Sequence, residues 1–207
     1  MSTAFEKRLA TLAQAQFDKY RWLRENQEPL AGQIKAYWID LGLAIPNVAQ
    51  PWSAVCVSWR VKQAGATAAQ FMFSPQHSQL VNAAIANAKA NAKSGTGVFM
   101  GRDVAQYAPK MGDILQNNRG HGAYTFQYAA THRSYPSHSA IVMEVGVDSK
   151  GNYLRTIGGN ESDSVGMKEV RLDANGLVKN PAGLYIAAIE TLLELEKRPQ
   201  AYFAGKK

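Results

Sequence analysis

The chain has 207 residues, 46% of them hydrophobic, which is enough for one well-buried domain and short for two. Its one cysteine excludes an intramolecular disulfide, and no apolar run approaches the roughly 20 residues that span a membrane. The net charge of +7 favours an anionic partner, but neither a dense helical stripe of Lys and Arg nor an RNA-binding aromatic motif is present. We therefore expect one domain over residues 1–207, with no nucleic-acid partner and no stable membrane insertion.

The first half of the chain is predicted to be helical. Residues 3–26 place apolar side chains at three- and four-residue spacing between charges, as an amphipathic helix does. A second helix is predicted from Leu30 to Leu41, closed by Gly42. We expect residues 1–29 to form a helical extension, 30–190 the core and 191–207 a charged tail.

A third helix is predicted from Pro51 to Ala64, because proline is favoured in the first helical turn and Gly65 ends the pattern. Ser53 then lies where unpaired backbone N–H groups and the helix dipole stabilise negative charge on an alkoxide. Cys56 follows one turn deeper on the same side. Both are candidate nucleophiles, although a first-turn serine also serves as a cap and a lone cysteine as a small buried residue.

A fourth, alanine-rich helix is predicted to begin at Ser74-Pro75 and to run to about Lys93. His77 lies in its first turn. There it is either a solvated histidine or a residue that lines a cleft.

From Ser94 onward the pattern changes to that of strands. Helices first and antiparallel strands afterwards predict an α+β fold, with N-terminal helices packed on a five- to six-stranded antiparallel sheet. The polar and aromatic insertion at 117–137 is long for a loop, which is typical of a functional segment. The predicted strands are 114–115, 138–147, 153–157, 168–172 and 183–190, with a hairpin turn at 148–152.

Two strand ends carry candidates for the remaining parts of a hydrolase. His138 begins the longest predicted strand, and Asn160 ends the next one. If the strand faces the helix start, two rigid elements can hold a nucleophile and a base within hydrogen-bond reach of each other. The Asn160 amide would then orient the imidazole, as the third member of a triad does.

Four motifs, taken together and in this order, resemble a known superfamily. They are PWSAVCVSW at 51–59, GDI at 112–114, SHSAIV at 137–142 and IGGNESDSV at 157–165. The chain is similar to the NlpC-type and CHAP-type papain-like peptidoglycan hydrolases over roughly residues 30–190, above all to a bacterial branch first catalogued as a domain of unknown function. This resemblance implies a papain-like fold and hydrolysis of a cell-wall amide through an acyl-enzyme.

The resemblance also implies roles for single residues. It makes His138 the general base and Asn160 the orienting residue. Relatives with a PWCA motif have cysteine at the position of Ser53, so the nucleophile is either Ser53 or Cys56, or catalysis has been lost. The glutamate that CHAP-type relatives place two residues before the asparagine is Gly158 here.

The substrate-binding residues are predicted to be Trp52, His77 and His121. No Cys or His pair has the spacing of zinc ligands, so we expect neither a metal nor a cofactor.

Partners and location follow from the same resemblance. It implies peptidoglycan as substrate. Superfamily members without signal peptides include toxins injected by secretion machines, so the resemblance also implies a secretion apparatus and a cognate immunity protein as partners. The protein itself is expected to be a monomer. Residues 1–17 are charged where a signal peptide is apolar, so we expect cytoplasmic synthesis and export to a target cell's periplasm. The alternative is an inactive module of the same fold that binds the wall or a partner.

Overall fold

The computed structural model describes residues 2–46, 50–94 and 98–194. Within them the α-helices are α1 (Ala4–Tyr20), α2 (Leu30–Asp40), α3 (Ser53–Ala64), α4 (His77–Ser94) and the short α5 (Phe126–Ala129). The strands are β1 (Phe99–Asp103), β2 (Ile114–Asn118), β3 (Ser137–Asp148), β4 (Gly151–Glu161), β5 (Ser164–Arg171) and β6 (Tyr185–Thr191).

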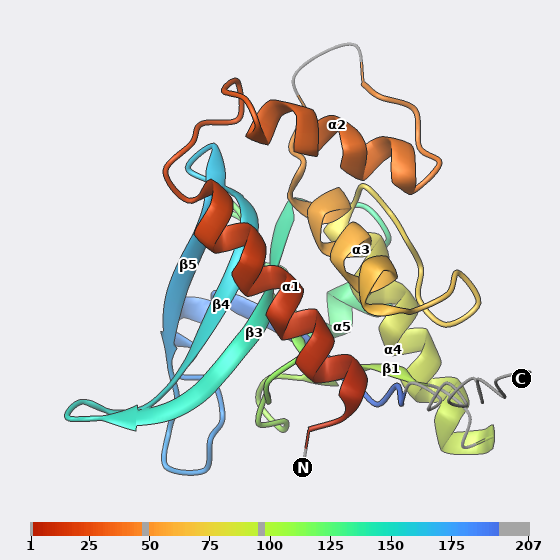
Figure 1. The fold of residues 1–207 in the computed structure, drawn as a ribbon. Coiled ribbons are helices and arrows are strands. Elements are labelled where there is room, and N and C mark those ends of the chain that lie inside the picture. The colour runs from red at the N-terminus through yellow and green to blue at the C-terminus, as the bar shows by residue number, and fades with distance from the viewer. Residues whose placement is uncertain (1, 47–49, 95–97, 195–207) are drawn as a thin grey trace, which may run out of the picture.

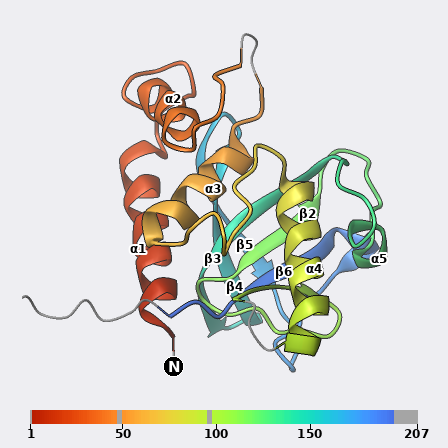
Figure 2. The same cartoon turned by 90° about the vertical axis from the view of Figure 1, so that its right-hand side faces the viewer.

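The six strands form one antiparallel sheet in the order β1-β6-β2-β3-β4-β5. Helices α1 and α3 lie side by side and pack against β3 and β4, while α4 packs against β1 (Figures 1 and 2). The predicted α+β fold, with N-terminal helices on a six-stranded antiparallel sheet, is therefore confirmed. None of the described helices combines the length and the hydropathy needed to cross a membrane.

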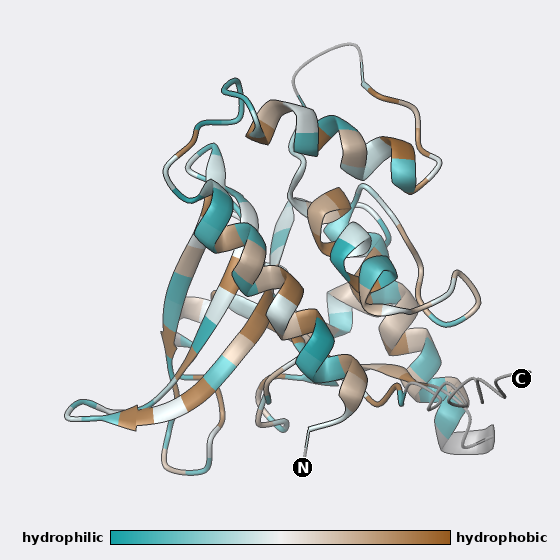
Figure 3. Ribbon diagram, viewed as in Figure 1, coloured by the Kyte–Doolittle hydropathy of each residue, from teal (hydrophilic) through white to brown (hydrophobic). Residues whose placement is uncertain are grey.

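Helix α1 is stabilised by a cap at its N-terminus and by an apolar face that is buried. The Thr3 side chain accepts from the Glu6 N–H and the Glu6 carboxylate accepts from the Thr3 N–H, which is a complete capping box. Phe5, Leu9 and Ala13 lie on the face that is buried. Hydrophilic and hydrophobic residues alternate along the helix (Figure 3). Since these apolar residues join the same core as α3 and the sheet, α1 is part of that core.

Helix α3 is held in place by a buried arginine and a close backbone approach. The fully buried Arg60 donates from Nε to Gln16 Oε1 of α1 at 2.9 Å and from Nη1 to the Ile157 carbonyl of β4 at 3.3 Å. At Gly159 of β4 a Cβ atom would lie 2.7 Å from Cys56 Sγ, so glycine lets the strand touch the helix. These contacts fix the helix start, where Ser53 is the first helical residue.

Several boundaries differ from the sequence-based prediction. The first helix ends at Tyr20 instead of residue 26, the third begins at Ser53 instead of Pro51, and the fourth begins at His77 instead of Ser74. Strand β1 and helix α5 were not predicted. The predicted tail lies outside the described residues from 195 onward.

Strand β1 escapes prediction because of its glycine. Gly101 in the sequence FMGRD is typical of a turn, but it permits the close packing of α4 on the strand. A Cβ atom at Gly101 would lie 2.5 Å from Ile85 Cγ1.

Candidate functional site

The structure brings Ser53 and His77 into contact. Ser53 begins α3, His77 begins α4, and the Ser53 Oγ atom lies 2.7 Å from His77 Nε2. Both side chains are buried, with exposed fractions of 1% and 6%. This distance allows the Ser53 hydroxyl to donate to a neutral His77 imidazole, and that pairing generates a serine nucleophile.

The loop between α3 and α4 is fastened so that His77 reaches Ser53. Ser58 Oγ donates to the Ser74 carbonyl at 3.0 Å and accepts from the Ser74 N–H at 3.1 Å. The Ser74 hydroxyl in turn accepts from the Gln76 N–H at 3.0 Å. These buried contacts tie the entry of α4 to the middle of α3, which fixes the relative position of the two helix starts.

His77 is held in its neutral form. Burial lowers the pKa of His77 well below 6.5, and the nearby charges of His138 and Arg119 lower it further. Within the described part of the chain, the buried Nδ1 atom has no hydrogen-bond partner. An uncharged imidazole at neutral pH is in the right state to accept a proton from Ser53.

A second histidine stands beside the first. The rings of His77 and His138 lie with their centroids 5.2 Å apart at 58°. His138 Nε2 is 2.8 Å from Glu161 Oε1, but the oxygen lies off the direction of an Nε2–H, so the contact is electrostatic more than an aligned hydrogen bond. Glu161 Oε2 also pairs with Lys168. The chain of contacts is therefore Ser53, His77, His138, Glu161 and Lys168.

Glu161 is kept ionised by these neighbours. Burial acts to raise the pKa of Glu161, but the contact with His138 and the charge of Lys168 outweigh it and lower the pKa to about 2. A carboxylate is thus present next to the histidine pair throughout the neutral range.

Glu161, and not the predicted Asn160, faces His138. Asn160 has a positive φ of 57°, and the β4–β5 register shifts between Gly159 and Glu161. This irregularity breaks the alternation that sequence reasoning assumes at the strand end. Among the described residues, no partner hydrogen-bonds to the Asn160 side chain. The signal that could have revealed Glu161 is its acidic character directly after the IGGN motif.

Other predicted site residues lie elsewhere. Cys56 is fully buried beneath Gly159, and burial raises the pKa of its thiol. Trp52 is also buried, donates from Nε1 to Glu25 Oε2 at 2.8 Å and stacks on Tyr37. His121 is exposed in the loop between β2 and α5. The structure therefore groups Ser53, His77 and His138. Cys56, Trp52 and His121 are not among the residues that line the pocket at Ser53.

A pocket of about 450 Å³ opens at Ser53 and His77. The segments before α3 and α4 form one wall, and the insertion at 117–137 forms the other. Tyr135 of that insertion is fixed because its hydroxyl donates to Gln116 Oε1 at 3.2 Å. The lining residues are Gln50, Pro51, Ser53, Pro75, Gln76, His77, Ser78, Arg119, Ser134, Tyr135, Pro136 and Ser137.

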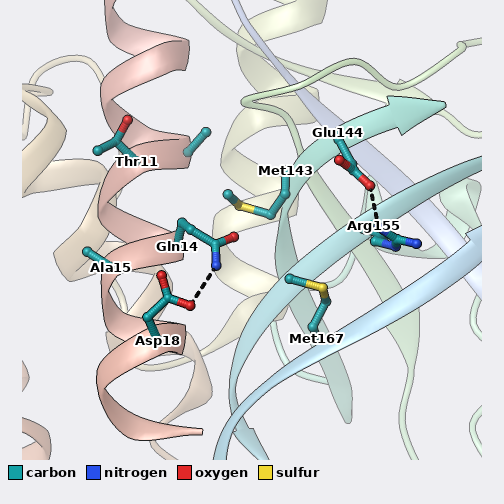
Figure 4. A pocket seen from close by; sticks show the side chains of 9 residues that line it. Thr11, Gln14, Ala15, Asp18, Met143, Glu144, Arg155 and Met167 are labelled. Carbon is teal, nitrogen blue, oxygen red and sulfur yellow. Dashed lines mark hydrogen bonds and ion pairs between the residues drawn. The ribbon is translucent and has the colours of Figure 1, made fainter.

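A larger pocket of about 550 Å³ lies between α1 and the sheet (Figure 4). Its described lining holds Asp18, Glu144 and Arg155 together with two methionines, and no serine, cysteine or histidine. Glu144 and Arg155 are already paired at 2.7 Å. The side chains with nucleophile and base chemistry therefore mark the smaller pocket as the candidate site.

The comparisons with known proteins give a family without an assigned activity. Residues 11–192 match the family described as "Uncharacterized protein conserved in bacteria (DUF2272)", and the chain belongs to this family. No curated protein and no solved structure matches the chain.

Proposed function

We propose that this DUF2272 protein is a serine-dependent peptidoglycan amide hydrolase with a papain-like arrangement. The observation that carries the proposal is the 2.7 Å contact between Ser53 Oγ and His77 Nε2 at a helix start beside a pocket. The four motifs that resemble NlpC-type and CHAP-type hydrolases support the choice of substrate. The order of a nucleophile on a helix, a histidine on a strand and a carboxylate on the next strand supports the arrangement. The proposal departs from the predicted role of His138 as base, because the histidine in contact with Ser53 is His77 of α4.

The proposed reaction begins with proton transfer from Ser53 Oγ to His77 Nε2 while Oγ attacks the amide carbon. The first helical hydrogen bond of α3 runs from the Cys56 N–H to the Trp52 carbonyl. Among the described residues, no hydrogen bond engages the earlier N–H groups of Ala54 and Val55, so they can stabilise the oxyanion. His77 then gives its proton to the leaving amine, which forms the acyl-enzyme, and water hydrolyses the ester with His77 again as base.

His138 and Glu161 act behind His77 in this proposal. Protonation of His77 places a positive charge in a buried site, and the Glu161 carboxylate is the negative group next to the histidine pair. His138 is thus a positioning residue that couples His77 to Glu161, and His77 is the base because its imidazole is the one in contact with Ser53.

Cys56 is excluded from the proposed chemistry by its surroundings. Its side chain is fully buried and the pKa of its thiol is raised, so little thiolate forms and none of it meets the pocket.

Digestion of purified sacculi by matched variants tests the proposal. Ser53→Ala should reduce the release of new amine and carboxyl termini by at least about 1,000-fold, whereas Cys56→Ala should stay within about threefold of wild type. Each variant removes a single heavy atom beyond Cβ from a neighbouring buried position, so Cys56→Ala is a control for general damage to α3.

Circular dichroism of both variants establishes that they are folded. Activity that survives in Ser53→Ala and disappears in Cys56→Ala would move the nucleophile to the cysteine. Wild-type protein that cosediments with sacculi without releasing termini would favour the inactive binding module instead.

A further inference from the structure

The described lining of the pocket at Ser53 carries positive charge and no negative charge. Its described lining consists of hydroxyl, amide and proline side chains, the neutral His77 and a single permanently charged group, the Arg119 guanidinium. No aspartate or glutamate is among these lining residues. The pocket therefore offers a positive potential to whatever enters it.

Arg119, directly after β2, differs from three arginines of the strands in that no described carboxylate pairs with its guanidinium. Arg102, Arg155 and Arg171 each pair with a carboxylate. Within the described residues, no ion pair or side-chain hydrogen bond engages the Arg119 guanidinium, and the residue is exposed. It is nevertheless close enough to His77 to disfavour a positive charge there. An unpaired guanidinium thus stands next to the nucleophile and its base.

We propose that Arg119 binds a free carboxylate of the substrate, close to the amide that Ser53 attacks. The proposal rests on the proposed function, and it narrows the substrate to cell-wall peptides that are anionic beside the scissile bond. A guanidinium presents several N–H donors in a planar fork that matches the two oxygens of a carboxylate. The hydroxyl and amide groups around it supply further donors without a competing acid.

Binding of this carboxylate would also assist the chemistry. The positive charge of Arg119 opposes protonation of His77, and a bound carboxylate cancels that charge. The base would therefore become stronger when a correct substrate is in place, so an anionic substrate gains in turnover as well as in affinity.

The test measures binding to Ser53→Ala protein, which cannot turn over in the proposed mechanism. The two probes are a synthetic cell-wall stem tetrapeptide with free carboxyl groups and the same peptide with every carboxyl group amidated. We expect the free acid to bind about 10-fold more tightly, the size expected for one charge-assisted contact. Adding Arg119→Gln should abolish this preference, and Arg119→Lys should keep part of it.

A matched control removes the same charge from the same insertion. Arg133 is exposed and contacts Met72 at 3.8 Å, outside the pocket lining. Arg133→Gln in the Ser53→Ala background should leave the preference for the free acid unchanged.

Equal binding of the two peptides, binding of neither, or a preference that survives Arg119→Gln would overturn the inference. These outcomes are separate from a failure of the proposed function, because that failure appears in the sacculus assay, either as digestion that does not need Ser53 or as binding without digestion.

Discussion

His77 combines close contact with a serine hydroxyl and burial of nearly all of its side chain. Its exposed fraction is 6%, and burial is the largest of the effects that keep it neutral. A neutral imidazole is the active form of a base. Under the proposed mechanism, loss of activity in acid should therefore follow the protonation of this residue.

The pH dependence of kcat/KM should report His77. Because the pKa of His77 is lowered well below 6.5, the base remains unprotonated as the pH falls past 6.5, and the acid limb of kcat/KM should have its midpoint below that value. Arg119→Gln removes one of the charges that lower this pKa, so its midpoint should move upward. The profile is measured on sacculi with a readout of released amines.

A wild-type midpoint at or above 6.5 would contradict the role of His77 as base. Arg133→Gln is again the control, because its charge does not act on His77 and its midpoint should equal that of wild type.

Single residues of the site differ in how far the sequence predicts them. Ser53 follows from Pro51 and the helix pattern, because a helix start is a local property. Its contact with His77 does not, because 24 residues separate the two and the loop between them is fixed by a buried Ser58–Ser74 pair. The choice of Glu161 over Asn160 depends on the positive φ of Asn160 and on the register shift beside it, neither of which is evident from the sequence.

The end of β4 connects helix packing to the site through two adjacent glycines. Gly159 faces α3, where an added Cβ would lie 2.6 Å from Trp52 and 2.7 Å from Cys56 Sγ. Gly158 faces the other way, where the Cβ would lie 2.9 Å from His138 Nε2 and 3.1 Å from Glu161 Oε1. The end of β4 thus determines how closely α3 packs on the sheet, through Gly159. Through Gly158 it also leaves the space that the His138 and Glu161 side chains occupy.

Alanine at these two positions should separate the two roles. Gly159→Ala forces a methyl group into a packed helix–strand contact, and we expect it to lower the free energy of unfolding by about 1–3 kcal/mol. Gly158→Ala meets the ends of two side chains that can move, so it should cost less stability and mainly reduce turnover. Urea unfolding and sacculus digestion measure the two effects.

Equal losses of stability in the two variants, or full activity in Gly158→Ala, would show that the strand end does not divide the roles in this way. The two changes serve as controls for each other because they add the same methyl group to neighbouring residues.

Elements were predicted well where their pattern is local. The amphipathic pattern of α1 is readable from the sequence, because its buried residues recur at the helical period. The hairpin of β3 and β4 is readable from its β-rich segments and the turn between them, since burial does not alternate along either strand. Strand β1 is not, because its glycine serves a contact with Ile85 that only the assembled fold reveals. The strand conformation of β1 is therefore set by tertiary packing and not by the local preference of its residues.

At the scale of the whole molecule, α1 is anchored at both of its ends, to the connection between β1 and β2 and to the start of β5. Glu6 pairs with Lys110, and the Ser164 hydroxyl donates to the Tyr20 carbonyl at 3.1 Å. The family match begins at residue 11 and so includes much of this helix. The helix that the sequence presents as an extension therefore helps to hold α3, and with it Ser53, against the sheet.

The charge of the whole chain complicates any assay in cells. With a net charge of +7, the protein is attracted to anionic surfaces whether or not it hydrolyses anything. A damaged envelope is therefore not in itself a sign of catalysis. Ser53→Ala solves this problem because it leaves the charge unchanged and removes the proposed nucleophile.

Expression in two compartments of a Gram-negative host should distinguish hydrolysis from charge. Peptidoglycan lies in the periplasm, so the wild-type chain should be tolerated in the cytoplasm and should cause rounding or lysis when a signal peptide fused to Met1 directs it to the periplasm. Cells are scored by microscopy and by loss of optical density.

Ser53→Ala and His77→Ala, directed to the periplasm at equal levels, should both be harmless, and Cys56→Ala should remain toxic. Toxicity that is the same in both compartments, or that persists in Ser53→Ala, would point to disturbance of an anionic surface by the basic chain, because only hydrolysis requires both the wall and the serine.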